Sequence, residues 1–297
     1  MLTVIIPTRN RPELLWNLLK NISRQLKEND KIIIVDSSDS KLRIDDFIFG
    51  VPIIYIFTTV KSAAVQRNIG IELLTNEKYL FFLDDDVCPS ANYFKSLVEI
   101  LERDDVVGVS GVALSSKRRE RRKKPFGLSG ILHRIFFLDS RIDGKVLASG
   151  VNIPVRDRDE NLVEVEWLIG CSAWKVDQLG STRFEYDFHG QSLAEDVIFS
   201  VRMNRKGKLV VNPRVELWHL ESEIERPEPK EHWKMWVKNR RRLLTVLNGG
   251  PRIEIAYWWA NLGQLLIFFF VMIKQRRWNL EPVKGLLSGF RDLMWKS

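Results

Sequence analysis

The feature that most constrains this 297-residue sequence is an apolar strand that runs directly into three consecutive aspartates. Residues 79–83 are apolar and aromatic, and Asp84, Asp85 and Asp86 follow them without a break. Adjacent carboxylates repel one another and raise one another's pKa, so such a triplet is costly unless a cation neutralises it. Hard oxygen ligands suit Mg²⁺ or Mn²⁺. The triplet therefore predicts a metal-assisted nucleotide site, and a solvated acidic turn is the alternative.

The N-terminal part of the chain alternates between strand-like and helix-like segments. Residues 3–6, 31–35 and 51–57 are short, β-branched runs typical of buried strands. Residues 12–26 carry leucines at helical spacing, and residues 63–74 form a second expected helix. This alternation predicts an α/β fold, with a parallel sheet covered by helices on both faces. Ligands of such sheets bind beyond the carboxyl ends of the strands, where the aspartate triplet falls.

Four further residues suit the same chemistry, each with a structural alternative. Asp36 follows a strand and can accept from a base or ribose, or can cap a turn. Arg67 suits a phosphate or the acidic loop, or a surface salt bridge. Asp196 sits at a helix start, where it would stay ionised and accept a proton, or would cap the helix. His219 follows a strand and is either a metal ligand or a core histidine.

In this order along the chain, these residues closely resemble the family 2 glycosyltransferases of GT-A fold. The resemblance covers roughly residues 1–225. It implies a Rossmann-like, nucleotide-binding mixed sheet flanked by helices. It also implies an inverting, metal-dependent transfer of a sugar from a nucleotide-diphosphate sugar to an acceptor hydroxyl, with Mg²⁺ or Mn²⁺ as cofactor. The acceptor expected for such a chain is a lipid-linked or cell-surface glycan intermediate.

The resemblance also implies a role for individual residues. Asp196 matches the catalytic base of the family's ED motif. Asp84 and Asp86 match the outer aspartates of its DxD motif, so Asp84 is expected at the ribose and Asp86 at the metal, with His219 as a second metal ligand. The role of Asp85 stays open between the nucleotide and the metal. The remaining nucleotide-binding residues implied by the match are Pro7, Thr8, Arg11 and Asp36, with Arg67 near the diphosphate and residues 165–174 beneath the donor sugar and acceptor.

The basic charge of the chain is concentrated in one place. The run at residues 117–124 holds seven basic residues and one acid, and so supplies most of the net charge of +8. Such local basicity favours a surface patch for an anionic membrane or phosphate. The run lacks the interleaved aromatics that stack on bases, so we expect no nucleic-acid partner. It belongs to an expected insertion, at about residues 115–152, onto which the resemblance transfers no role.

The C-terminal region, residues 226–297, is expected to be helical. Residues 255–273 are 19 residues without a charge, about the length that spans a bilayer. Asn261 and Gln264 interrupt them, and three aromatics at 257–259 crowd one end as an interfacial belt would. The pattern favours a tail that lies in one leaflet on anionic headgroups. A single span and a soluble helical core are the alternatives.

Two features suggest the compartment. The two cysteines, Cys88 and Cys171, cannot build a disulfide framework, which favours a reducing cytosol. The first residues carry no charged leader, so the start of the chain is expected to stay there. Together with the tail, they predict the cytoplasmic side of the cell membrane.

Two other functions remain compatible with the residues. A nucleotidyltransferase also uses a nucleotide-binding sheet and acidic metal ligands, but the glycine-rich basic loop that grips a triphosphate is missing near the first strand. It would release pyrophosphate instead of a nucleoside diphosphate. A non-enzymatic basic protein that binds membranes or nucleic acid is the other alternative. The oligomeric state is left open by the sequence.

Overall fold

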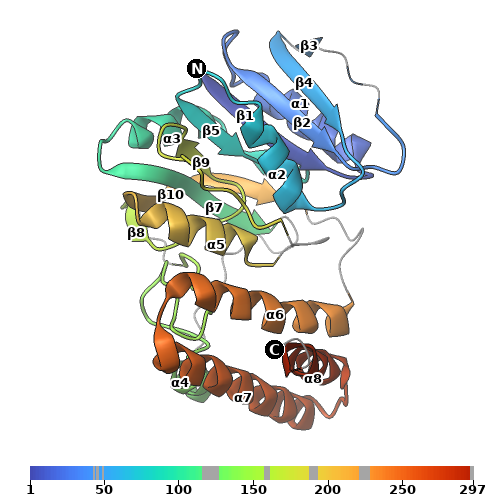
Figure 1. The fold of residues 1–297 in the computed structure, drawn as a ribbon, viewed down its shortest axis with the longest axis vertical. Coiled ribbons are helices and arrows are strands. Elements are labelled where there is room, and N and C mark those ends of the chain that lie inside the picture. The colour runs from blue at the N-terminus through green and yellow to red at the C-terminus, as the bar shows by residue number, and fades with distance from the viewer. Residues whose placement is uncertain are drawn as a thin grey trace. The chain divides into compact units, whose positions relative to one another are not determined.

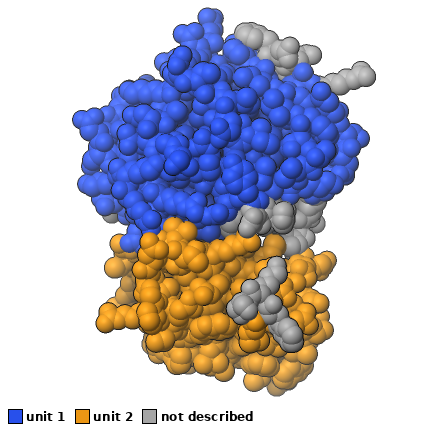
Figure 2. All heavy atoms as spheres, in the orientation of Figure 1, with its two compact units in different colours: residues 1–121, 157–223 blue, residues 122–156, 224–297 orange. Residues whose placement is uncertain are grey.

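The computed structural model describes residues 1–42, 44, 47–48, 50–115, 127–156, 161–186, 193–220 and 228–294. The chain divides into two compact units (Figure 2). Unit 1 comprises Met1–Arg121 and Asp157–Glu223, and unit 2 comprises Arg122–Arg156 and Ile224–Ser297. Each unit has its own hydrophobic core. The basic run at 117–124 lies outside the described residues.

Unit 1 is built on a mixed β-sheet (Figure 1). β1 pairs in parallel with β2 and β5, and β2 with β4, whereas β9 and β6 run antiparallel to their neighbours. The expected mixed α/β sheet is therefore confirmed, but the strands are parallel only in part of it. The strands in spatial order are β3 (Phe47–Ile48), β4 (Val51–Phe57), β2 (Lys31–Asp36), β1 (Leu2–Thr8), β5 (Tyr79–Phe82), β9 (Ala173–Lys175), β7 (Val106–Ser115), β10 (Lys208–His219) and β6 (Val87–Pro89), with β8 (Val163–Val165) paired to β10.

Helices cover both faces of this sheet. Because side chains alternate along a strand, β1 sends Val4 and Ile6 to one face and Ile5 to the other. Val4 and Ile6 belong to the core that contains the apolar side chains of α1 (Pro12–Ile22) and α3 (Tyr93–Leu101). On the opposite face Ile5 contacts α2 (Ala63–Glu72), while α5 (Glu195–Asn204) packs its Phe199 against the sheet. Contact with Ile5 is so close that a Cβ added at Gly70 of α2 would lie 2.5 Å from it.

The carboxyl ends of β1 and β2 meet at one edge of the sheet. Thr8 and Asp36 are partners in the register, and the Ser37 amide donates to the Thr8 carbonyl at 3.0 Å. Gln66 of α2 donates from Nε2 to the carbonyls of Thr8 (2.9 Å) and Val35 (2.6 Å). This buried amide ties both strand ends to α2, and so fixes the edge that carries the candidate site.

Unit 2 is helical. Its core gathers Val237, Leu244, Tyr257 and Leu286, and the Tyr257 hydroxyl donates to the Val237 carbonyl at 2.9 Å. Within the described residues, α7 is the helix long and apolar enough to cross a membrane, although core helices of soluble proteins pass the same test. This helix encloses the uncharged stretch at 255–273. The helices of unit 2 are α4 (Gly127–Ile135), α6 (Pro229–Leu247), α7 (Gly250–Gln275) and α8 (Glu281–Met294).

The described part of the expected insertion belongs to this helical unit. The buried Arg156 guanidinium pairs with Asp139 at 2.6 Å and with Asp143 at 3.0 Å. Arg240 of α6 donates to the Ser149 carbonyl of the same segment at 2.5 Å. Insertion and tail thus share polar contacts. The assignment of 1–225 as the catalytic domain and of 226–297 as a membrane-associated region stays a prediction.

Candidate active site

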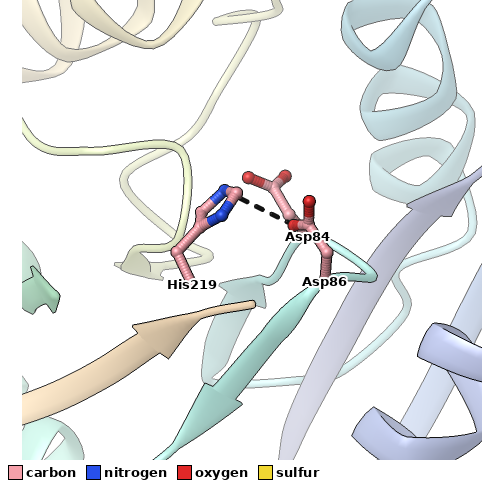
Figure 3. Close-up of side chains that lie close together, drawn as sticks. All are labelled: Asp84, Asp86 and His219. Carbon is pink, nitrogen blue, oxygen red and sulfur yellow. Dashed lines mark ion pairs between the residues drawn. The ribbon is translucent and has the colours of Figure 1, made fainter. Parts of the chain in front are cut away.

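The structure brings Asp84, Asp86 and His219 together in unit 1. Each offers a ligand atom, and these atoms lie within 4.8 Å of one another (Figure 3). The antiparallel pairing of β10 with β6 sets His219 opposite Val87, directly after the aspartates. His219 Nε2 lies 3.5 Å from Asp86 Oδ1. Carboxylate oxygens with one imidazole form a donor set that fits Mg²⁺ or Mn²⁺.

Burial makes the ionised forms of Asp85 and Asp86 costly. Burial, and then the neighbouring Asp84, raise the pKa of Asp86. Burial raises the pKa of Asp85 to about 6. A divalent cation would favour the ionised form of such groups, and thereby relieve the cost of burying them. The electrostatics of the cluster therefore agree with its ligand geometry.

Asp85 is held differently from its two neighbours. Its Oδ2 accepts from the Thr8 hydroxyl at 2.7 Å, at the end of β1. Its Oδ1 lies 3.2 Å from Nη1 of Arg11, and the same nitrogen lies 3.2 Å from Asp86 Oδ2. Thr8 and Arg11, both expected at the nucleotide, thus contact the aspartate triplet directly.

Arg67 links the acidic cluster to the start of α5. Its guanidinium is buried in α2 and donates from Nη2 to Asp84 Oδ1 at 2.7 Å. The same guanidinium forms an ion pair with Glu195 through Nη1. The sequence left three partners open for Arg67: a phosphate, the acidic loop or a surface salt bridge. In the structure Arg67 contacts the acidic loop. Sequence reasoning gave no role to Glu195, although its place beside Asp196 was a signal.

Asp196 follows Glu195 in the first turn of α5. The residue before the pair, Ala194, has a left-handed backbone with φ of 69°, so α5 begins abruptly after the preceding loop. Asp196 is half-buried, and its Oδ1 accepts from the Val197 amide at 2.8 Å. Burial raises the pKa of Asp196 to about 6, against the opposing effect of Arg67. At pH 7 the group is mostly a carboxylate that can still take a proton.

Asp36 lies at the end of β2, away from solvent, and is already engaged by the protein. The Tyr55 hydroxyl donates to its Oδ2 at 2.6 Å, and the Ser38 amide donates to its Oδ1 at 2.8 Å. A base bound here would have to share or replace one of these bonds. Pro7 is buried next to Thr8 in β1.

The segment expected beneath the donor sugar passes beside the acidic cluster. A Cβ added at Gly170 would lie 3.3 Å from Arg67 Nη2 and 3.7 Å from Asp84 Oδ2. The next residue, Cys171, is buried and accepts from the Asp84 amide at 3.4 Å. The glycine therefore lets the backbone approach the Arg67–Asp84 pair.

The fold and this acidic site define the class of protein, a glycosyltransferase of GT-A fold. Three solved structures share the fold at low sequence identity. GalNAc-T7 with UDP, GalNAc and Mn²⁺ is 13% identical, with a TM-score of 0.61 over 82% of this chain and 47% of that one. Mannosyltransferase PcManGT from Pyrobaculum calidifontis, in complex with GDP-Man and Mn²⁺, is 14% identical, with a TM-score of 0.56 over 100% and 87%. S. aureus TarS 1-349 with UDP-GlcNAc is 12% identical, with a TM-score of 0.55 over 98% and 80%.

The sequence itself gives the family. The model for glycosyl transferase family 2 matches residues 3–152, half of the chain, and this protein belongs to that family. An uncharacterized glycosyltransferase of Haemophilus influenzae is 29% identical over 105 residues. That match covers 35% of this chain and 35% of the relative, about a third of each. The expected family is confirmed.

Proposed function

We propose that this glycosyltransferase is an inverting, metal-dependent enzyme that moves a sugar from a nucleotide-diphosphate sugar to an acceptor hydroxyl. The observation that carries the proposal is the buried guanidinium of Arg67. It pairs with Asp84 of the candidate metal cluster and with Glu195, the residue before the candidate base. One side chain thus links the proposed metal cluster to the helix that carries the proposed base.

Asp196 is the proposed general base. It would take the acceptor proton as the hydroxyl oxygen attacks the anomeric carbon from the face opposite the nucleotide. A single displacement of this kind inverts the anomeric centre and needs no covalent nucleophile. The pKa of Asp196, raised to about 6 by burial, suits a base that works near neutral pH.

Asp86 and His219 are the proposed metal-binding residues. Asp84, which the sequence resemblance placed at the ribose, is proposed to join them because its carboxylate belongs to the same group of ligand atoms. Mn²⁺ is named in the GalNAc-T7 and PcManGT structures. A bound Mg²⁺ or Mn²⁺ would act as a Lewis acid toward the charge that develops on the departing diphosphate. Arg11 lies on the edge of this cluster and would contact the phosphates, since a guanidinium matches phosphate oxygens. Asp36 is the proposed acceptor for the nucleotide base.

The proposed acceptor is a lipid-linked or cell-surface glycan intermediate at the cytoplasmic side of the cell membrane. The long apolar helix α7 supports membrane association, and the two cysteines, too few for a disulfide framework, support the cytoplasmic side. Assembly of glycans on lipid carriers takes place at such a surface, so a membrane-associated enzyme would meet its acceptor there.

The test is a donor screen with product analysis. The full chain is incubated with UDP-, dTDP- and GDP-linked sugars with and without Mn²⁺, and released nucleotides are separated. Metal-dependent release of a nucleoside diphosphate supports the proposal, provided that Asp196→Asn abolishes turnover and still binds the donor. In a parallel incubation with nucleoside triphosphates and sugar phosphates, release of pyrophosphate would instead favour a nucleotidyltransferase. Full activity of Asp196→Asn would remove the proposed base.

A further inference from the structure

Unit 2 carries an exposed apolar surface that the proposed chemistry does not use. Along α7 the exposed apolar side chains recur at intervals of three and four residues, which places them on one face of the helix. This α7 stripe includes Ile255, Trp259, Leu262, Leu266, Phe269 and Ile273, each at least 41% exposed. It runs along most of a helix of 26 residues, about 39 Å at the usual rise.

The insertion adds a second apolar row. On α4 the side chains of Leu128, Ile131 and Ile135 are 67%, 48% and 53% exposed. Their spacing of three and then four residues again makes one face. Soluble proteins rarely leave contiguous apolar patches of this extent uncovered.

The end of α4 is fastened to the N-terminal half of α7, and the two helices lie next to each other (Figure 1). Trp259 donates from Nε1 to the Ile135 carbonyl at 2.8 Å, and its ring lies 4.9 Å from that of Phe136. Phe136 can come this close to α7 only because residue 263 is a glycine, since a Cβ added at Gly263 would lie 2.1 Å from Phe136 Cγ. The two rows therefore form one surface, which we call the α4–α7 face.

The opposite side of α7 argues against a membrane-spanning helix. There Asn261 is 1% exposed, and its Oδ1 lies 3.4 Å from Nη1 of Arg240 on α6. α6 carries six lysines and arginines along 19 residues. If α7 crossed a bilayer, its partner α6 would enter the hydrocarbon too, where each central Lys or Arg is strongly unfavourable. A helix that exposes one apolar face and packs its other face on a basic helix suits an orientation parallel to the surface.

The charges around the α4–α7 face match an anionic lipid surface. No charged residue lies between Ile255 and Ile273, whereas Arg252 stands before the α7 stripe and Lys274, Arg276 and Arg277 stand after it. All four cations are exposed. Indole rings such as those of Trp258 and Trp259, both exposed, favour the headgroup level of a bilayer.

We propose that α4 and α7 together form a membrane-docking face that lies flat in the interface of an anionic bilayer. The insertion is then a part of the membrane-binding surface and not a separate excursion. The inference rests on the proposed membrane association, which it extends from the tail to the insertion. Aliphatic and aromatic side chains of both helices would enter the acyl boundary, and the flanking cations would meet the headgroups.

The experiment is vesicle flotation of the full chain, diluted from mild detergent. The vesicles contain phosphatidylcholine alone, or phosphatidylcholine with about 30% phosphatidylglycerol as the anionic lipid. Four variants are compared with the wild type. Leu128→Glu/Ile131→Glu tests α4, Leu266→Glu/Phe269→Glu tests α7, and Trp16→Glu is the control at an exposed aromatic of unit 1. Leu128→Ser/Ile131→Ser repeats the α4 test without added charge.

We expect the wild type and Trp16→Glu to float with anionic vesicles. Both α4 variants and the α7 variant should partition at least about tenfold less, since each removes two apolar anchors. Donor-induced thermal stabilisation with Mn²⁺ is measured on every variant, because it reports the catalytic unit separately. Its absence in the wild type would count against the proposed function and leave the membrane inference standing.

Two outcomes would overturn the inference. If only the α7 variant loses vesicle binding, the insertion takes no part in docking. If the wild type does not bind vesicles but sediments as a dimer that Leu128→Glu/Ile131→Glu dissociates, a second copy covers the face.

Discussion

Arg67 and Glu195 form a buried ion pair between α2 and the first turn of α5, and the remaining arm of the same guanidinium reaches Asp84 at 2.7 Å. Both Arg67 and Glu195 are less than 10% exposed. The coulombic effect of Glu195 and Asp84 raises the pKa of Arg67 despite its burial, so the charge is permanent. One side chain thus sets the position of a candidate metal ligand relative to the helix that carries Asp196.

Removing this arginine should cost both stability and activity. In Arg67→Met, Glu195 stays buried without its opposite charge, and we expect the free energy of unfolding in urea to fall by about 3–5 kcal/mol. The double variant Arg67→Met/Glu195→Gln should recover part of that stability but none of the turnover, since Asp84 has still lost its partner. An Arg67→Met protein with wild-type stability would show that the ion pair does not form in solution.

Asp196→Asn should abolish turnover while donor binding persists. In the wild type the pKa of about 6 predicts that kcat/KM falls as the pH drops through that value, because protonated Asp196 cannot accept the acceptor proton. The measurement is a pH profile of nucleoside diphosphate release between pH 5 and 9. A profile that stays flat down to pH 5 would exclude Asp196 as the base.

The same variant should be more stable than the wild type. The pKa of Asp196 is raised from 3.8 to about 6 on folding, so the folded protein holds the proton more tightly than the unfolded chain. Ionisation of Asp196 therefore lowers the free energy of unfolding of the wild type. This loss of stability is absent below pH 4, grows between pH 4 and 6, and is complete above pH 6. Asn avoids it and can still accept from the Val197 amide, so we expect a gain on the order of 1 kcal/mol at pH 7. Thermal melts at pH 4 and pH 7 test this, and an equal gain at both would point to another cause.

The sequence predicts much of this fold because local patterns settle it. The parallel core, β1, β2, β4 and β5, appears at nearly the expected residues, since each is a continuous apolar run bounded by turn residues. What the pattern could not show is the antiparallel part of the sheet. β9 is three residues long, and its place between β5 and β7 depends on pairing across long stretches of sequence. α1 also ends at Ile22, earlier than its leucines suggested.

The candidate site, like the fold, could be predicted from the sequence only in part. Residue types at strand ends pointed to Asp84, Asp86 and His219, and a carboxylate at a helix start pointed to Asp196. The structure brings Asp84, Asp86 and His219 together. Nothing local shows that Tyr55 would occupy an oxygen of Asp36, because the two residues lie on different strands. Nor does the sequence reveal that the insertion shares contacts with the C-terminal helices, since Ser149 and Arg240 meet only through the tertiary fold.

Gly170→Ala should lower activity with little change in stability. The added methyl group would lie 3.3 Å from Arg67 Nη2, closer than most such contacts, so the Arg67–Asp84 pair must shift by a few tenths of an ångström. Misplacement of a positioning group by such amounts costs catalysis more than folding, and we expect kcat/KM to fall about tenfold. Steady-state kinetics and a thermal melt check this together. Unchanged kinetics would show that the pair tolerates the shift.

The metal cluster is tested by removing its ligands one at a time. Asp86→Ala should abolish Mn²⁺-dependent turnover and leave the fold intact, because the lost carboxylate is one whose pKa is already raised by burial and by Asp84. His219→Ala should keep some activity and require at least about tenfold more Mn²⁺, since two carboxylates remain. The matched control is Asp39→Asn, at an exposed aspartate paired with Lys61. It should require the same Mn²⁺ concentration as the wild type. The readouts are turnover and thermal stabilisation as functions of Mn²⁺ concentration. If Asp86→Ala unfolds the protein, the aspartates are structural. If His219→Ala requires no more Mn²⁺ than the wild type, the imidazole does not bind the metal.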